Sequence, residues 1–341
     1  MNNRTRCRAP GTPPIAVLSI AMRIALSAAL LLALFSAHAP GAYPDKPIRL
    51  IVPVAPGGGA DITARAIAQK LGATWGQQVI IDNRAGAGGT VGMDIGAHST
   101  PDGYTVIEGS MGPLTVDVSL YNNLPYDPVR DFTPVARAVT ALNMLVVHPS
   151  LPVYSVKELI AYAKANPLRL NFGSSGAGRA DHLAGEMFNT LAGVKMQHVP
   201  YKGGAPAMVD LVGGNIQLIF ATVSTAVTSV KAGRIRPLAM TTANRVEMFP
   251  ELPTVAEAGV PGFAVDNWYG FIGPRGLPRD IAIKLHGEIN RALAAPDVKT
   301  RLEQLGILPF LLPTPEAFGD YIKSEIAKYA RVVKDSGARA E

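Results

Sequence analysis

Short apolar runs alternate with amphipathic segments along most of this chain. Apolar runs of strand length, most of them rich in β-branched residues, predict strands at 48–54, 79–82, 104–108, 142–147, 168–172, 216–220 and 235–240. Apolar residues at helical spacing predict helices at 62–71, 155–165, 180–191, 207–212, 281–293 and 315–333. Because strands alternate with helices, we predict an α/β fold with parallel sheets that are covered on both faces.

Two similar segments indicate how such a chain is divided. Residues 145–159 and 271–285 each read as a short strand, a proline-containing turn and a helix. Coincidence is the alternative, because such segments are common, but the interpretation we favour is a chain that crosses twice between two lobes. Within the first segment, Ser155 is expected to cap the helix and Glu158 to complete a capping box.

The first 42 residues have the order of a secretory signal peptide. Residues 1–23 contain arginines and no acid, an apolar run fills 24–35, and small residues follow. A membrane anchor is the alternative, but the apolar run is shorter than the roughly 20 residues of a typical span. Cleavage is expected after Ala39 or after Ala42, which predicts export to the periplasm.

Composition narrows the classes of protein that fit. The chain has 341 residues, a net charge of +6 and no run of lysine or arginine, so we expect no nucleic-acid partner. Its one cysteine, Cys7, lies in the predicted signal peptide. The exported chain would then have no thiol, which fits an oxidising compartment and excludes cysteine catalysis and thiolate metal sites.

Signatures of catalysis and of cofactor binding are missing from the sequence. There is no G-x-S-x-G elbow and no H-E-x-x-H, and the histidines lack metal-ligand spacing. The glycines of 83–90 do not fit G-x-G-x-x-G, since position 91 is valine, and no segment fits the P-loop. We therefore expect no cofactor, no metal and no enzymatic activity, with an enzyme of unfamiliar type as the alternative.

The first candidate site is a glycine-rich loop between a predicted strand and a predicted helix. Glycine lets the backbone approach a ligand, and a helix start offers unpaired N–H groups and a partial positive charge. Together these can bind an anion without a cationic side chain, although a plain turn is the alternative. Asp61 is expected to be the N-cap and to order the loop. The loop consists of Pro56, Gly57, Gly58, Gly59, Ala60 and Asp61.

A second loop, rich in glycine and serine, also leads from a predicted strand into a predicted helix. Serine hydroxyls, backbone amides and Arg179 converge in it, and arginine is the best bidentate partner of a carboxylate. His182 lies in the first helical turn, where a hydrogen bond to the loop backbone is a better interpretation than ligand contact. The candidate residues are Ser174, Ser175, Gly176, Gly178, Arg179 and His182.

A third loop, at 198–206, leads into the short helix predicted at 207–212. Pro206 suits the first turn of that helix. Tyr201 and Lys202 could line a pocket there, and a solvated side chain is an equal alternative for Lys202.

Seven motifs in this order resemble the Bug family, the extracytoplasmic receptors of tripartite tricarboxylate transporters. The resemblance covers the chain from about residue 43 to the end. The motifs are YPDKPIR at 43–49, VAPGGGAD at 54–61, DNRAGAGG at 82–89, PDGY at 101–104, HLAGEMF at 182–188, VPYKG at 199–203 and FPELPT at 249–254.

The resemblance implies a type II periplasmic binding protein fold, with two lobes, two crossover strands and a ligand cleft between the lobes. We expect lobe I at 43–141 plus 266–341, and lobe II at 142–265. The implied function is a monomeric receptor that binds a small organic carboxylate and delivers it to a membrane permease. A sensor that reports its ligand to a signalling protein is the alternative. The family accepts amino acids, citrate-like acids and aromatic acids, so the resemblance names no single ligand.

The resemblance also implies a site. In the family, one ligand carboxylate is held by the loop after the first strand and by the Gly/Ser loop of the second lobe, largely through backbone amides and ordered water. This implies the same role for 56–61 and 174–179 here. The position of Arg179 is usually Ser or Thr in the family, so Arg179 would either grip a second carboxylate or fill the cleft. The side chains expected to tune the rest of the pocket are Ser110, Arg179, Tyr201 and Trp268.

Overall fold

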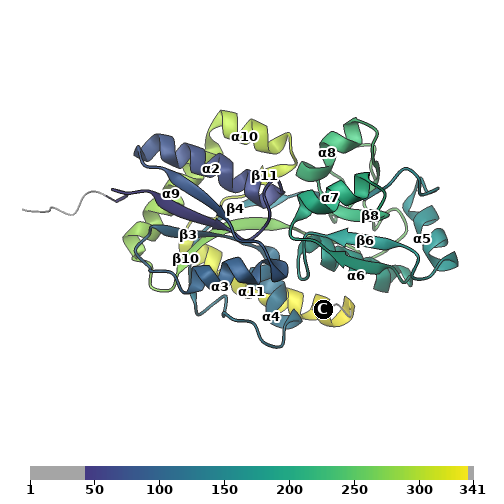
Figure 1. Ribbon diagram of the computed structural model, residues 1–341, viewed down its shortest axis with the longest axis horizontal. Helices are drawn as coiled ribbons and strands as arrows, with labels where there is room; N and C mark the ends of the chain where they lie inside the picture. Colours follow the sequence, from purple (N-terminus) through teal and green to yellow (C-terminus); the bar gives the residue numbers. More distant parts are fainter. Residues whose placement is uncertain (1–42, 337–341) are drawn as a thin grey trace, which may run out of the picture. The chain divides into compact units, whose positions relative to one another are not determined.

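Two β-sheets with helices on both faces make up the described part of the chain, which is residues 43–336 of the computed structural model (Figure 1). The predicted signal peptide at 1–42 lies outside the described residues. The predicted α/β architecture is confirmed. Within the described residues, no helix has the length and apolar character that crossing a bilayer requires.

The first sheet contains six strands. They are β1 (Ile48–Val52), β2 (Val79–Asn83), β3 (Thr105–Ser110), β4 (Phe132–Ala141), β10 (Trp268–Pro274) and β11 (Ile307–Pro309). The spatial order is β11-β4-β10-β3-β1-β2. Strands β1, β2 and β3 run parallel, whereas β10 is antiparallel to both of its neighbours and β11 is antiparallel to β4.

The second sheet contains five strands. They are β5 (Asn143–Val147), β6 (Asn171–Ser174), β7 (Gln197–Pro200), β8 (Leu218–Thr222) and β9 (Arg236–Met240). The spatial order is β7-β6-β8-β5-β9. Strand β6 is parallel to β7 and β8, whereas β5 is antiparallel to β8 and β9.

The prediction of parallel sheets is therefore wrong at β5, β10 and β11. Strand β5 follows β4 after a single residue, Leu142, with no helix between them to return the chain to the first sheet. The chain passes back through 241–267 before β10 begins. Because an apolar run has the same composition in either direction, the sequence pattern predicts a strand but not its orientation. Strand β4 was not predicted at all, since Pro134 and Arg137 interrupt its apolar pattern.

Helices cover both faces of each sheet (Figure 1). On the first sheet, α2, α9 and α10 lie on one face and α3, α4 and α11 on the other; on the second sheet, α7 and α8 lie opposite α5 and α6. Their bounds are α2 Gly59–Trp75, α3 Thr90–Ala97, α4 Asp117–Leu120, α5 Val156–Ala165, α6 Ala180–Ala192, α7 Gly204–Val212, α8 Val223–Lys231, α9 Arg279–Ala294, α10 Pro296–Glu303 and α11 Pro315–Ser336. Two short helical turns, η1 (Ala87–Gly89) and η2 (Gly112–Val116), precede α3 and α4.

Ser155 is the N-cap of α5, as predicted. Its hydroxyl accepts a hydrogen bond from the backbone N–H of Glu158 at 3.2 Å. The Glu158 carboxylate accepts from the N–H of Tyr154 rather than from that of Ser155, so the predicted capping box forms one residue out of register.

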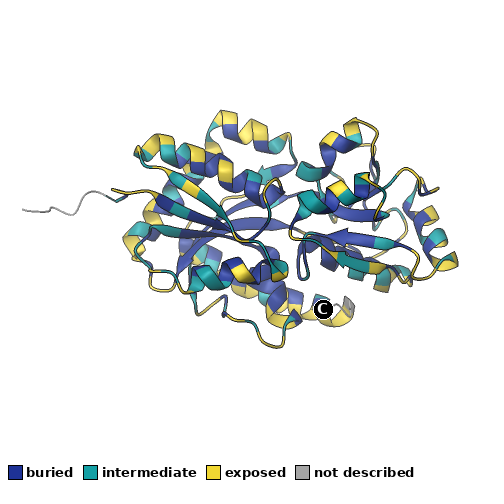
Figure 2. Cartoon of the chain, viewed as in Figure 1, coloured by how far each residue is buried: buried dark blue, intermediate teal, exposed yellow. Residues whose placement is uncertain are grey.

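The central strands are the most buried part of the fold (Figure 2). Every residue of β5 and of β10 is buried. In β5, Leu145 and Val147 pack into a core that also includes residues of the first sheet, while Met144 and Val146 pack into a second core under α7 and α8. Because the larger core joins both sheets, the described residues from Lys46 onward form one compact unit.

Candidate ligand-binding site

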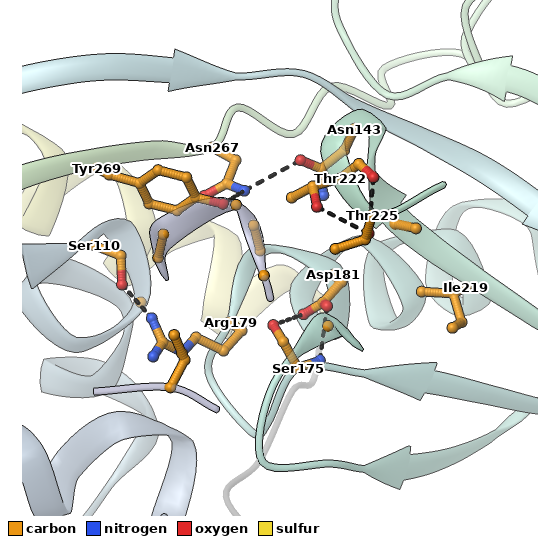
Figure 3. A pocket seen from close by; sticks show the side chains of 18 residues that line it. Ser110, Asn143, Ser175, Arg179, Asp181, Ile219, Thr222, Thr225, Asn267 and Tyr269 are labelled. Carbon is orange, nitrogen blue, oxygen red and sulfur yellow. Dashed lines mark hydrogen bonds between the residues drawn. The ribbon is translucent and has the colours of Figure 1, made fainter. Parts of the chain in front are cut away.

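A cavity of about 40 Å³ lies where loops from both sheets meet (Figure 3). Its wall contains several of the predicted site residues, namely Gly58, Gly59, Ala60, Ser110, Ser175 and Arg179. The other residues of the wall are Val54, Gly112, Asn143, Ala180, Asp181, Gly204, Ile219, Ala221, Thr222, Thr225, Asn267 and Tyr269.

Four helices begin at this cavity. Their N-cap residues are Gly58 for α2, Arg179 for α6, Gly203 for α7 and Thr222 for α8. Among the described residues, no N-cap side chain of these four helices caps the first turn. Each helix start presents backbone N–H groups and the positive end of its dipole, so the four together favour an anion in the cavity.

Asp61 orders the first loop from behind the cavity wall. It lies in the first turn of α2, and Gly58 is the N-cap, so the prediction of Asp61 as N-cap is wrong. The Asp61 carboxylate accepts from the Gly57 N–H at 2.9 Å and from the Arg65 and Asn83 side chains. Burial acts to raise the pKa of Asp61, but these hydrogen bonds outweigh it and hold the pKa below its ordinary value. Pro56, Gly57 and Asp61 do not line the cavity.

Asp181 has a corresponding role in the second loop. Its carboxylate accepts from the Ser175 N–H at 2.7 Å and from the Ser175 hydroxyl at 3.0 Å. Burial raises the pKa of Asp181 to about 6, against the effect of these hydrogen bonds. Unlike Asp61, Asp181 lines the cavity, although Asp181 is not one of the predicted site residues.

Two histidines support the second loop from below. The Gly178 N–H donates to His182 Nδ1 at 3.1 Å, which confirms the predicted bond between His182 and the loop backbone. The rings of His182 and His198 lie 4.1 Å apart, and His198 Nε2 is 2.6 Å from the Ser174 hydroxyl, which accepts from the Gly176 N–H. Burial lowers the pKa of His182 to about 4 and that of His198 to about 3, so both rings are neutral near pH 7. Four of the predicted site residues in this loop and helix do not line the cavity, namely Ser174, Gly176, Gly178 and His182.

The third predicted loop supplies backbone rather than side chains. Tyr201 turns away from the cavity and donates to Asp210 at 2.6 Å. The Lys202 side chain is exposed, which favours its solvated interpretation. The Lys202 carbonyl accepts from the Ala55 N–H at 2.8 Å and thereby joins the loop after β1 to the loop before α7.

Trp268 lies on the opposite side of β10 from the cavity. Its ring is fully buried against Phe318 and Tyr321 of α11, and its indole N–H donates to Glu325 at 3.2 Å. The neighbouring residue Tyr269 lines the cavity instead. Successive side chains of a strand point to opposite faces of the sheet. Tyr269 therefore faces the cavity, and Trp268, which was expected to tune the pocket, faces away from it.

Neutral polar side chains that were not among the predicted site residues form another part of the cavity wall. Figure 3 shows Asn143, Thr222, Thr225, Asn267 and Tyr269 together on one side of the cavity. The Asn267 amide donates to Asn143 Oδ1 at 3.1 Å and to the Tyr269 hydroxyl at 3.3 Å. These residues lie at strand ends or helix starts. The sequence feature that could have indicated them is a polar residue near the edge of an apolar run, such as Asn143 in the run 142–147.

Arg179 closes the opposite end of the cavity. It donates to the Ser110 hydroxyl and, at 3.0 Å, to the carbonyl oxygen of Pro53. The buried carboxyl groups of Glu108 and Asp117 have no hydrogen-bond partner among the described residues. Burial raises the pKa of each to about 7, and the positive charge of Arg179 acts in the other direction on both. No group of three or more His, Cys, Asp or Glu side chains within residues 43–336 could hold a metal ion.

Comparison with known proteins identifies the family. Residues 63–338 match the family described as the tripartite tricarboxylate transporter family receptor, TctC. The chain belongs to this family. BugT of Bordetella pertussis is 37% identical over 298 residues, which are 87% of this chain and 91% of BugT. The resemblance to the Bug family is therefore confirmed.

Two solved structures resemble this TctC family member along nearly their full length. Rpa4515 of R. palustris, solved with adipate, is 38% identical with a TM-score of 0.84, and the match covers 87% of this chain and 99% of that one. MatC of Rhodopseudomonas palustris, solved with bound malate, is 34% identical with a TM-score of 0.82, and the match covers 85% and 100%. The predicted two-lobed periplasmic binding protein fold is confirmed by this likeness and by the two sheets.

The buried carboxyl group of Glu108 should make the stability of this TctC family member depend on pH. Its pKa of about 7 lies above the ordinary 4.5, so between these values the folded chain holds a proton that the unfolded chain releases. The free energy of unfolding supplied by Glu108 therefore falls as pH rises through this range. Glutamine cannot ionise, so Glu108→Gln is expected to be more stable than wild type at pH 8 by about 1–3 kcal/mol, with little gain near pH 4.5.

Urea unfolding of both proteins at pH 4.5 and pH 8 measures this difference. Glu247→Gln, at an exposed position, is the matched control and should show no such change with pH. The other buried titratable groups are present in both proteins, so their effects cancel; they include Asp117, Asp181, His182 and His198. A Glu108→Gln protein that is less stable than wild type at pH 8 would contradict the expectation.

Proposed function

We propose that this protein is a periplasmic receptor that binds a small organic carboxylate in the cavity and delivers it to a tripartite tricarboxylate-type permease. The observation that carries the proposal is the meeting of four helix N-termini at one cavity. Such an arrangement stabilises an anion without a dedicated cation. The adipate and malate in the structures of two relatives support a carboxylate as that anion.

The carboxylate would lie between the starts of α2 and α6. Gly58, Gly59 and Ala60 supply backbone from the first sheet, and Ala180 and Asp181 supply it from the second. Asp61 and Asp181 direct their carboxylates to loop N–H groups, which fixes the shape of both loops before a ligand arrives. Because both loops are already ordered, ligand binding costs less conformational entropy than it would with flexible loops.

We further propose that the lobes are 43–141 plus 266–341 and 142–265, and that the ligand stabilises their closed arrangement. Direct contacts across the cavity support closure. The Ala55 N–H bonds to the Lys202 carbonyl, and a Cβ added to Gly112 would lie 2.8 Å from the carbonyl oxygen of Gly178. A Cβ on Gly88 would overlap the carbonyl oxygen of Ala177. A ligand that touches both lobes would favour this closed state over an open one, and the permease would recognise that difference.

Thermal unfolding of the purified protein with a panel of solutes tests the proposal. The panel contains acetate, pyruvate, lactate, malate, succinate and adipate, each paired with its uncharged amide. At least one carboxylate is expected to raise the melting temperature by about 2–6 °C at roughly 100 times its Kd, and its amide is not. Stabilisation by neutral sugars or amines alone, with no response to any carboxylate, would refute the proposal.

A further inference from the structure

Arg179 connects the two sheets across one end of the cavity. Arg179 is the N-cap of α6, a helix that packs on the second sheet, and its side chain reaches the first sheet. There the guanidinium donates to the hydroxyl of Ser110 at the end of β3 and to the carbonyl of Pro53 just after β1. Only 5% of Arg179 is exposed. Figure 3 shows its guanidinium directed at Ser110 and away from Asp181 and Ser175. Nη1 and Nη2 each donate within the protein, whereas the buried Nε has no partner among the described residues.

The positive charge of Arg179 also acts on buried carboxyl groups of the protein. Glu108 and Asp117 are fully buried, and the carboxylate oxygens of neither have a hydrogen-bond partner among the described residues. Arg179 lies close enough to both for its charge to stabilise their ionised forms. Asp181, on the cavity wall, is a third carboxyl group that Arg179 influences. A ligand carboxylate placed near Arg179 would therefore share one guanidinium charge with the buried carboxyl groups of Glu108 and Asp117.

The rest of the cavity also suits a ligand with a single charge. A buried water needs roughly 10–15 Å³ of cavity volume, so the cavity of about 40 Å³ holds about three waters and suits a compact molecule better than an extended diacid. Away from the helix starts, the wall consists of the amides and hydroxyls of Asn143, Asn267, Thr222, Thr225 and Tyr269. These groups can pair with a hydroxyl or keto oxygen and carry no positive charge for a second carboxylate.

We propose that Arg179 is a specificity-determining clasp, that is, a side-chain link between the two lobes that shortens the cavity. As a result, this receptor selects short hydroxy- or keto-monocarboxylates over dicarboxylates. This inference rests on the proposed function, because it assumes that the cavity binds a carboxylate. The ligand carboxylate takes the seat at the helix starts, its hydroxyl or keto oxygen faces the amide and hydroxyl wall, and Arg179 occupies the space that a longer acid would need.

Isothermal titration calorimetry with defined acids tests the inference. The probes are lactate and pyruvate on one side and malonate, succinate and adipate on the other. The wild-type protein is expected to bind the better monocarboxylate at least about tenfold more tightly than any of the dicarboxylates. Arg179→Ser removes the clasp and frees its space, so this ratio is expected to shift by about tenfold or more towards the dicarboxylates.

Arg169→Ser is the matched control, because Arg169 is exposed in the same part of the chain and should leave the ratio unchanged. Ser110→Ala removes one acceptor of the clasp and is expected to shift the ratio in the same direction by a smaller factor. If Arg179→Ser does not fold, the wild-type ratio and Ser110→Ala still decide the matter.

Two results would overturn the inference while leaving the proposed function intact. One is a wild-type protein that binds a dicarboxylate as tightly as lactate and pyruvate or more tightly. The other is an Arg179→Ser protein that folds and keeps the wild-type ratio. If no carboxylate binds and only neutral solutes do, the proposed function itself fails and the inference fails with it.

Discussion

Replacing Trp268 with alanine is expected to lower the free energy of unfolding by about 3–5 kcal/mol and to leave the affinity for ligand nearly unchanged. The Trp268 ring is fully buried between β10 and α11, edge-on to Phe318 and Tyr321. Its removal would leave a large apolar void and would deprive Glu325 of the indole N–H. Because the ring faces away from the cavity, the ligand should be unaffected wherever the variant is folded. Urea unfolding and calorimetry on the same preparation measure the two quantities.

Tyr269→Phe is the matched comparison for Trp268→Ala. Tyr269 is the next residue of the same strand, but its hydroxyl accepts from Asn267 at the cavity wall. Removing only this hydroxyl should weaken ligand binding and change stability much less than the loss of Trp268 does. A folded Trp268→Ala protein that loses most of its affinity would restore the expectation from sequence that Trp268 tunes the pocket.

Replacing Gly112 with alanine is expected to weaken ligand binding by about tenfold or more without unfolding the protein. Gly112 begins the turn η2, and the added Cβ would lie 2.8 Å from the Gly178 carbonyl oxygen and 3.3 Å from Arg179 Cα. The obstructing atoms belong to a lobe II loop in the proposed division. An open arrangement would relieve the contact and a closed one could not, so the substitution opposes the state that binds ligand.

Calorimetry and ligand-dependent small-angle scattering would follow affinity and closure of the Gly112→Ala protein. The control is Gly287→Ala in α9, where the added Cβ would have only the Arg291 side chain near it, at 3.9 Å. Wild-type affinity in Gly112→Ala would mean that the loops separate without cost, and the contact across the cavity would then not limit closure.

The local features of this protein could be predicted from its sequence. Runs of glycine between a strand and a helix mark the starts of α2 and α6, and both prove to lie at the cavity. The bond between His182 and the loop backbone also follows from local spacing, since the two partners are four residues apart. Such features depend on a few neighbouring residues, which a single sequence displays.

The features that the sequence could not predict depend on register and on distant segments. Every residue of β10 is buried, so the alternation that would separate Trp268 from Tyr269 is hidden. The wall formed by Asn143, Thr222 and Asn267 joins three segments, and the bond between Asn143 and Asn267 spans 124 residues. The role of Arg179 as a link between sheets likewise depends on Pro53, which lies 126 residues away.

The glycines that meet across the cavity limit how this receptor can change in evolution. At the contact between Gly112 and Gly178, the atom that obstructs a larger residue at Gly112 is the backbone carbonyl oxygen of Gly178, which every amino acid carries. A larger residue on one side therefore cannot be accommodated by a smaller residue on the other, as is common in packed cores. Compensation would have to come from movement of a whole loop, so new ligand preferences should arise at the polar wall and at Arg179 far more readily than at these glycines.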